Sequence, residues 1–185
     1  MVGAVVTGKK VYTYDLEFLE DGRSIELISI GIVCEDGREY YAVNAEMPIR
    51  RIRKHKWLME NVVPSLPKAY GDWRNHMPRH WLFNYDDPAV KRRDDIAFEV
   101  GEFLLSDGEP VLWADWGAYD HVALCQLWGT MMDLPSGMPM FTHDIEQAIE
   151  AVPGFEKPVQ AHGVHNALED ARHNMAILRK LWAQS

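Results

Sequence analysis

Four carboxylates and one imidazole stand along this chain in spacings that fit metal-assisted hydrolysis of a phosphodiester. Asp15 and Glu17 form a D-x-E element inside an apolar N-terminal run, and Asp120 lies where a strand is predicted to give way to a helix. His165 and Asp170 form an H-x-A-x-x-D element near the C-terminus. Two-metal sites hold their ions about 3.5–4 Å apart and use them to activate water against phosphate. In this chain order, the five side chains predict a two-metal phosphodiesterase site.

The D-x-E element has two readings. Asp15 and Glu17 are two residues apart, so in a strand their side chains share one face. Two ionised carboxylates buried side by side cost several kcal/mol unless they are paired, and a divalent cation supplies that pairing. The alternative is an exposed sheet edge that carries two ordinary acids. The tripeptide alone does not decide between them.

The third acid has a rival in the sequence. A predicted strand ends at Ala114, and ligands of open α/β sheets bind beyond the carboxyl ends of strands. Asp115 follows that strand directly. The pair Tyr119-Asp120 opens a predicted helix, and Asp120 is therefore the preferred ligand. Its alternative role is that of an acid that complements the positive end of the helix dipole.

The C-terminal element places an acid and an imidazole around a helix start. Asp170 falls in the first turn of the last predicted helix, where the helix dipole favours an ionised carboxylate. On one continuous helix, His165 would lie about 140° away from Asp170. We therefore expect His165 on the loop that enters the helix, where it acts as a general base toward metal-bound water. The alternative is a histidine that only borders the helix.

Candidate substrate contacts follow the metal ligands along the chain. Phe18 and Leu19 come directly after the D-x-E element, and either wedge or stack the terminal base, an interaction of ~1–3 kcal/mol, or pack in the core. Arg23 or Glu26 is a candidate to hydrogen-bond a base edge, with surface solvation as the alternative. Tyr119 belongs to the same group because it adjoins the preferred third acid.

The elements that must position these residues predict an α/β fold. Apolar runs and turn signals indicate strands at residues 11–18, 24–34, 39–45, 109–114 and 141–143. Helical spacing indicates helices at residues 50–61, 96–104, 120–128, 144–149 and 166–182. Three consecutive strands form an antiparallel meander, and alternating helices and strands follow it. We expect a central mixed five-stranded sheet with helices on both faces.

Bulk composition sets the class of protein. The 185 residues fit one domain, with residues 1–8 as a loose leader. No apolar run approaches the roughly 20 residues of a membrane span, and no secretion signal is present, so we expect a cytoplasmic protein without a membrane partner. A net charge of −9 argues against coating nucleic acid by bulk attraction. Local phosphate contacts remain open at two basic patches, residues 50–56 and 91–93.

Taken together, the motifs resemble those of the DEDD family of 3′–5′ exonucleases, subtype with histidine, over most of the chain. The resemblance implies a ribonuclease H-like fold. A narrower similarity is to the actinobacterial polyadenylate-specific exoribonucleases, RNase AS, and it is carried by residues 15–22, 25–31, 37–43 and 117–129. Many members of the wider family have Thr and Gly where Phe18 and Leu19 stand, and Asn where Trp116 stands. RNase AS shares the first of these departures.

The narrower resemblance implies an activity and a ligand set. It implies release of nucleoside 5′-monophosphates from the 3′ ends of single-stranded RNA, with adenylate tails as substrate and two Mg²⁺ ions, replaceable by Mn²⁺, as cofactors. One ion is implied on Asp15, Glu17 and Asp170, and the second on Asp15 with Asp120 at most in its outer shell, while His165 takes the proton. The alternatives are a proofreading DNA exonuclease and a non-catalytic RNA-binding module; a lost ligand would mark the latter, and none is lost.

The resemblance also implies a homodimer. An independent ground is the aromatic content of the region that includes the irregular segment 64–88 and the helix before it, because this region is hard to bury in one small domain. Its aromatic members are Trp57, Trp73, Trp81, Phe83 and Tyr85. The alternative is that these side chains close over the core of their own subunit.

Overall fold

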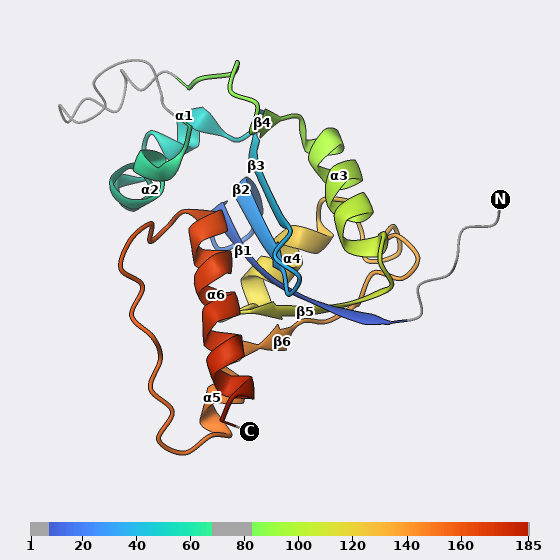
Figure 1. Ribbon diagram of the computed structural model, residues 1–185. Helices are drawn as coiled ribbons and strands as arrows, with labels where there is room; N and C mark the ends of the chain where they lie inside the picture. Colours follow the sequence, from blue (N-terminus) through green and yellow to red (C-terminus); the bar gives the residue numbers. More distant parts are fainter. Residues whose placement is uncertain (1–7, 68–82, 185) are drawn as a thin grey trace.

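The computed structural model describes residues 8–67 and 83–184. Its centre is a six-stranded sheet in the order β4-β3-β2-β1-β5-β6 (Figure 1). The strands are β1 (Lys9–Glu20), β2 (Ile25–Cys34), β3 (Glu39–Asn44), β4 (Val90–Lys91), β5 (Glu109–Ala114) and β6 (His143–Asp144). Strands β1, β2 and β3 pair antiparallel, whereas the β1–β5, β3–β4 and β5–β6 pairs are parallel. The predicted mixed sheet with an N-terminal meander is therefore confirmed.

The predicted number of strands was wrong, because the sheet has six strands instead of five. The additional strand is β4, whose two residues pair in parallel with Val43 and Asn44 at the edge of the sheet. Two residues cannot display the alternation of period two by which a strand is recognised in a sequence. The last predicted strand is also shifted, since β6 begins at His143.

Helices lie on both faces of the sheet, as expected (Figure 1). They are α1 (Ile49–Ile52), α2 (Lys56–Asn61), α3 (Arg93–Leu105), α4 (Ala118–Cys125), α5 (Ile145–Glu150) and α6 (Ala167–Trp182), with a 3₁₀ turn η1 (Val63–Ser65). The single helix predicted at residues 50–61 is in fact two short helices. The break is fixed by His55, whose Nδ1 atom accepts a hydrogen bond from the backbone N–H of Leu58, 3.3 Å away. Most of the irregular segment 64–88 lies outside the described residues.

Three apolar clusters explain the layering. Tyr12, Tyr14 and Leu16 of β1 pack against α3 and α4 on one face of the sheet. On the other face, Val33 packs against α6, and Val43 packs against the lobe formed by α1, α2 and η1. Within the described residues, no helix combines the length and apolar character needed to cross a membrane.

Helix α6 has the boundaries and the apolar face that its sequence predicts. Its N-cap is Asn166, whose side chain accepts a hydrogen bond from the backbone N–H of Glu169 at 3.2 Å. The buried side chains recur at helical spacing: Ala167, Ala171, Asn174, Met175, Ile177, Leu178 and Leu181. This amphipathic face holds the helix across β1 and β2 (Figure 1), so the first turn of α6 lies over the middle of the sheet.

Gly31 allows the first turn of α6 to approach the sheet. Gly31 pairs with Asp15 across β1 and β2, and a Cβ atom at Gly31 would lie 2.3 Å from the backbone of Ala167 and Leu168. Further along, Thr13 Oγ1 donates a hydrogen bond to the carbonyl of Ala171 at 2.8 Å. The absence of a side chain at residue 31 therefore sets the height of α6 above β1.

Gly31→Ala is expected to displace α6 and to destabilise the fold by about 1–3 kcal/mol or more, because the new methyl group meets backbone atoms that cannot rotate away. The measurement is thermal unfolding together with nuclease activity. Gly101→Ala on α3 is the matched control, since its Cβ would meet only Trp128, at 3.9 Å. That control should hold or gain stability, because Ala favours a helix over Gly. An unchanged melting temperature in Gly31→Ala would contradict this account.

Candidate active site

The site lies where β1 and β5 part. Their parallel ladder covers Lys9–Thr13 and Glu109–Trp113, and β1 then continues alone on that side as far as Glu20. Asp15 and Glu17 lie on this continuation, on the face that α6 covers. Glu17 is 8% exposed. A split between parallel strands at the carboxyl end of β5 is where open α/β sheets bind ligands.

Asp120 lies beside β1 at the level of Leu16, beyond the last pair between β1 and β5. It is buried in the first turn of α4, and its Oδ1 atom accepts a hydrogen bond from the backbone N–H of Leu16, 2.8 Å away. This bond replaces a ladder bond that β5 no longer provides. The turn before the helix is fixed by Asp144, whose Oδ2 accepts from the N–H of Gly117 at 3.0 Å. The rival acid, Asp115, forms an ion pair with Lys157 at 2.8 Å.

Asp170 and His165 approach from α6 and from the loop before it. The potential ligand atoms of Glu17, His165 and Asp170 all lie within 4.8 Å of one another. The Nδ1 atom of His165 is 3.9 Å from Glu17 Oε1, and the imidazole is 35% exposed. His165 is therefore on the loop that enters the helix, as predicted, and its side chain turns toward Glu17.

Residues from the α1–α2–η1 lobe hold the His165 backbone and ring. His165 has a φ of 65°, a left-handed conformation that is rare outside glycine. Its carbonyl accepts a hydrogen bond from Ser65 Oγ at 2.6 Å, and its ring centroid is 4.8 Å from that of Trp57 in an edge-to-face contact. Asn166 Nδ2 donates to the Ser65 carbonyl at 3.1 Å. Ser65 could not be predicted from the sequence, because a contact spanning 100 residues leaves no local pattern.

The acids of the site resist ionisation in the absence of a cation. Burial, followed by repulsion from Asp170 and Asp120, raises the pKa of Glu17 to about 8. Burial also raises the pKa of Asp120 to about 6, although the N–H of Leu16 acts in the opposite direction. The pKa of Asp15 is raised by burial and then by the charges of Asp120, Glu17 and Asp170. Such a cluster is stable when a positive charge is present.

The donor set fits divalent cations. Carboxylate oxygens are the ligands of Mg²⁺ and Mn²⁺, and one imidazole beside them is compatible with either ion. Glu17 of β1 and Asp170 of α6 supply two carboxylates beside His165, and Asp120 of α4 lies against β1 through its hydrogen bond to Leu16. Lys157, which is ion-paired to Asp115 and Glu146, is the nearby cation, and it is engaged outside the cluster of Glu17, His165 and Asp170.

The metal-free protein is expected to lose stability as the pH rises from about 5 to about 8. The folded-state pKa of Glu17, about 8, lies above its ordinary value of 4.5, so the folded state retains a proton that the unfolded state releases in this window. The free energy of unfolding therefore falls with rising pH. Thermal unfolding in chelator, with a parallel series in saturating Mg²⁺, measures the effect. The Mg²⁺ series should be nearly flat, and a flat chelator series would contradict the electrostatic account.

The predicted substrate residues divide between two faces of the sheet. Phe18 stacks on Tyr119 with ring centroids 6.4 Å apart and an interplanar angle of 17°, and Tyr119 is 57% exposed. Leu19 is buried and packs with Ile28 and Val43 under the α1–α2–η1 lobe. Successive strand residues point to opposite faces, so Phe18 and Leu19 do not share one surface. The structure thus gives Leu19 the core position that the sequence left open.

Arg23 and Glu26 line a cavity of about 440 Å³ at the turn of the β1–β2 hairpin. Its wall includes Leu27, which pairs with Phe18, and Ala123, which lies one turn after Tyr119 on α4. The cavity therefore adjoins the Phe18–Tyr119 stack. Arg23 is exposed, and Glu26 forms an ion pair with Arg51.

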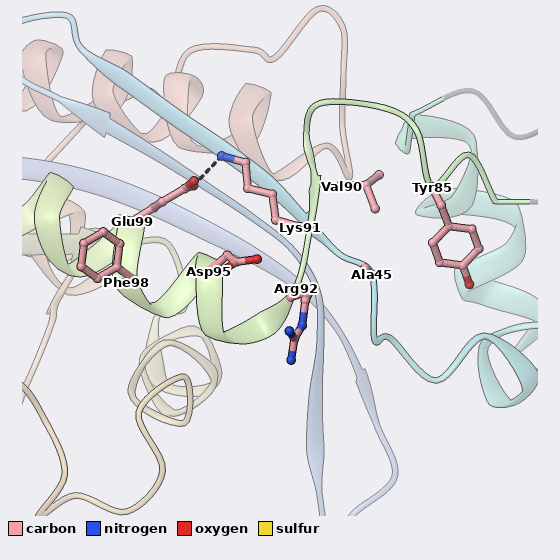
Figure 2. A pocket seen from close by; sticks show the side chains of 8 residues that line it. All are labelled: Ala45, Tyr85, Val90, Lys91, Arg92, Asp95, Phe98 and Glu99. Atoms are coloured by element: carbon pink, nitrogen blue, oxygen red, sulfur yellow. Dashed lines mark hydrogen bonds and ion pairs between the residues drawn. The ribbon is translucent and has the colours of Figure 1, made fainter.

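A second hollow, of about 520 Å³, lies between β4 and α3 (Figure 2). Figure 2 shows Lys91 reaching toward Glu99, with Tyr85 and Phe98 at opposite ends of the hollow. Neither Glu17 nor Asp170 lines it. The basic patch at residues 91–93 is largely engaged in this region, since Arg92 lies 3.7 Å from Glu46.

The fold and the clustered acids define a hydrolase-type site, and comparison with known proteins places the chain in a family. The family model described as the Rv2179c-like 3′–5′ exoribonuclease domain matches residues 10–182, so the chain belongs to that family and is a 3′–5′ exoribonuclease by class. The chain is similar to the 3′–5′ exoribonuclease Rv2179c of Mycobacterium tuberculosis strain H37Rv, with 43% identity over 171 residues, 91% of this chain and 90% of the relative. The 3′–5′ exoribonuclease MT2234.1 of strain CDC 1551 matches to the same extent.

Proposed function

We propose that this protein is a metal-dependent exoribonuclease of the DEDD type that shortens single-stranded RNA from its 3′ end. Its active site consists of Asp15, Glu17, Asp120, Asp170 and His165. One observation carries the proposal: ligand atoms of Glu17, His165 and Asp170, from opposite ends of the chain, lie within 4.8 Å of one another. A ribonuclease H-like arrangement of the sheet agrees with this assignment.

Two Mg²⁺ ions, or Mn²⁺ in their place, supply an activated water and neutralise the charge on the leaving oxygen when bound. Asp15, Glu17 and Asp170 would hold one ion, and Asp15 would also be a ligand of the other. Asp120 acts at most in the outer shell, which agrees with the hydrogen bond that its Oδ1 accepts from Leu16. This assignment of residues to the two ions comes from the resemblance to the DEDD family.

His165 takes the proton from the attacking water in this reaction. The bond between the terminal phosphorus and the 3′ oxygen of the preceding nucleotide breaks, and a nucleoside 5′-monophosphate leaves. The loop position of His165, its partial exposure and its contact with Trp57 keep the ring at the cluster without burying it. The ring can therefore exchange its proton with solvent between turnovers.

Adenylate-rich tails are the proposed substrate, by the similarity to RNase AS. The Phe18–Tyr119 stack offers an aromatic surface for the terminal base, and such stacking is worth about 1–3 kcal/mol per base. Base identity is then read in the adjoining cavity, where Glu26 accepts a hydrogen bond from an exocyclic amino group such as that of adenine. Arg23 lies on the rim of the same cavity.

Digestion of 5′-labelled A, U, C and G homopolymers, with Mg²⁺ present and with chelator, tests the activity and the base preference together. The A homopolymer should be shortened fastest, in single-nucleotide steps, and chelator should stop the reaction on all four. Equal rates on the four polymers would remove the adenylate preference alone. Faster digestion of a DNA strand of matched sequence would favour the proofreading alternative.

The strand reaches the site past the basic patch at residues 50–56. This patch lies on the α1–α2–η1 lobe, whose Ser65 and Trp57 hold His165, and Arg50, Lys54 and Lys56 are exposed there. Local cations of this kind bind phosphate despite the net charge of −9. We expect nuclease activity to be lower at high salt. We expect the largest loss of activity in a Lys54→Ala/Lys56→Ala double variant.

A homodimer is the proposed assembly. Trp57 is 47% exposed and Tyr85 is 58% exposed, which leaves aromatic surface on the lobe, whereas Phe83 is buried within its own subunit. Trp73 and Trp81 lie outside the described residues. In a dimer, the basic patch of one subunit would lie near the active site of the other. Light scattering at micromolar concentration is the test, and a monomer mass with full activity would refute both the dimer and this cross-subunit role.

A further inference from the structure

The segment between α5 and α6, residues 151–166, has no helix or strand and runs alongside α6 (Figure 1). Connections of this length within a compact domain are uncommon and usually have a function. Its last residues carry His165 and the N-cap Asn166. The middle of the segment is the part that neither the sequence motifs nor the reaction above explains.

Ion pairs and backbone contacts fix the middle of this segment against the rest of the protein. Lys157 Nζ lies 2.8 Å from Asp115 Oδ2 and also pairs with Glu146, so it links the segment to the end of β5 and to α5. Lys180 of α6 donates a hydrogen bond to the carbonyl of Glu156 at 2.6 Å. These side chains are half-buried, so solvent screens them less than it screens surface pairs.

Gln160 lies three residues after Lys157 and reaches the metal cluster. Its Nε2 atom donates a hydrogen bond to Asp170 Oδ1, and the two atoms are 2.6 Å apart. An amide can fix one carboxylate oxygen without adding a positive charge that would compete with a cation. A carboxylate has two oxygen atoms, so this bond leaves Asp170 a second oxygen through which it can bind a cation beside Glu17 and His165.

We propose that Gln160 is a positioning residue that holds the Asp170 carboxylate in its metal-binding orientation, and that Lys157 presents Gln160 by anchoring residues 151–166. This inference rests on the metal dependence in the proposed function. Hydrogen bonds to a metal ligand from such outer partners typically change metal affinity 10–100-fold when they are removed. The sequence offers no motif for Gln160, because its partner is set by the path of an irregular segment.

Direct binding of Mn²⁺, measured by titration calorimetry in the absence of RNA, tests the role of Gln160. Gln160→Met keeps the length of the side chain and removes its donor, and it should weaken Mn²⁺ binding about 10–100-fold. Gln160→Asn keeps the amide but shortens its reach, so it should also weaken binding. Val159→Ala is the matched control, since Val159 is 91% exposed on the same segment and should bind Mn²⁺ as the parent does.

Each outcome has a distinct meaning. Parent-like Mn²⁺ affinity in Gln160→Met would overturn the positioning role while leaving the metal site intact. An equal loss in Val159→Ala would overturn it too, because the effect would then come from the segment as a whole. A parent protein that binds no Mn²⁺ would remove metal dependence from the proposed function, and this role with it. Unfolding curves in chelator, expected to be alike for all variants, exclude loss of fold as the cause.

Discussion

Asp15→Asn should reduce turnover on a 3′ RNA end by roughly a thousandfold or more, because the bound ions supply several kcal/mol of the transition-state stabilisation. Asp15 is the acid that the mechanism assigns to both ions. The pKa of Asp15 is raised by burial and by the charges of Asp120, Glu17 and Asp170, so its carboxyl group favours the protonated form when no cation is bound. Asn keeps the size of the side chain and removes this charge. Single-turnover digestion of labelled RNA in saturating Mg²⁺ measures the loss.

The same substitution should stabilise the protein in chelator. Removal of one charge from a repelling cluster favours the folded state, and each 1 kcal/mol corresponds to a rise of about 2–4 °C in melting temperature for a chain of this size. Asp94→Asn is the matched control: it makes the same charge change on α3, at a side chain that is 88% exposed. The control should retain full turnover and its melting temperature. Asp15→Asn with parent-like turnover would exclude Asp15 from the metal site.

Activity and stability thus oppose each other at this site. Burial and, after it, the charges of Asp170 and Asp120 together raise the pKa of Glu17 to about 8. A fold that buries several acids close together without a cation is less stable at neutral pH, and such a loss of stability is common at functional sites. Because the acids come from β1, α4 and α6, the strain is shared between elements that the apolar core holds in place.

Helices and strands could be predicted because their apolar residues recur at the period of a helix or of a strand. The buried positions of α6 recur at helical spacing, and the alternation along β1 places Asp15 and Glu17 on one face. From those elements, the loop position of His165 and the preference for Asp120 followed as geometry. The structure brings the ligand atoms of Glu17, His165 and Asp170 within 4.8 Å of one another, and Asp120 lies beside β1 through its hydrogen bond to Leu16.

The features that could not be predicted depend on contacts that leave no local pattern in the sequence. Strand β4 has two residues and owes its state to pairing with β3. The contact of Ser65 with His165 spans 100 residues, and that of Gln160 with Asp170 depends on an irregular segment. For Leu19 the sequence left two roles open, a base contact or core packing, and the structure places it in the core on the face opposite Phe18.

His165→Ala should lower turnover about 10²–10⁴-fold, the usual contribution of a positioned general base. The His165 ring lies 3.9 Å from Glu17 Oε1, and the hydrogen bond from Ser65 to the carbonyl of residue 165 does not depend on the side chain that the substitution removes. The variant should therefore keep its fold, its RNA affinity and its Mn²⁺ binding. Turnover, Mn²⁺ titration and RNA binding in Ca²⁺ separate these quantities.

The matched control for this variant is His162→Ala, which removes an exposed imidazole three residues earlier in the same segment. It should keep parent-like turnover. Near-normal turnover in His165→Ala would remove it from the mechanism. Loss of Mn²⁺ binding in step with turnover would instead make His165 a ligand, because its ring nitrogen lies within 4.8 Å of the ligand atoms of Glu17 and Asp170.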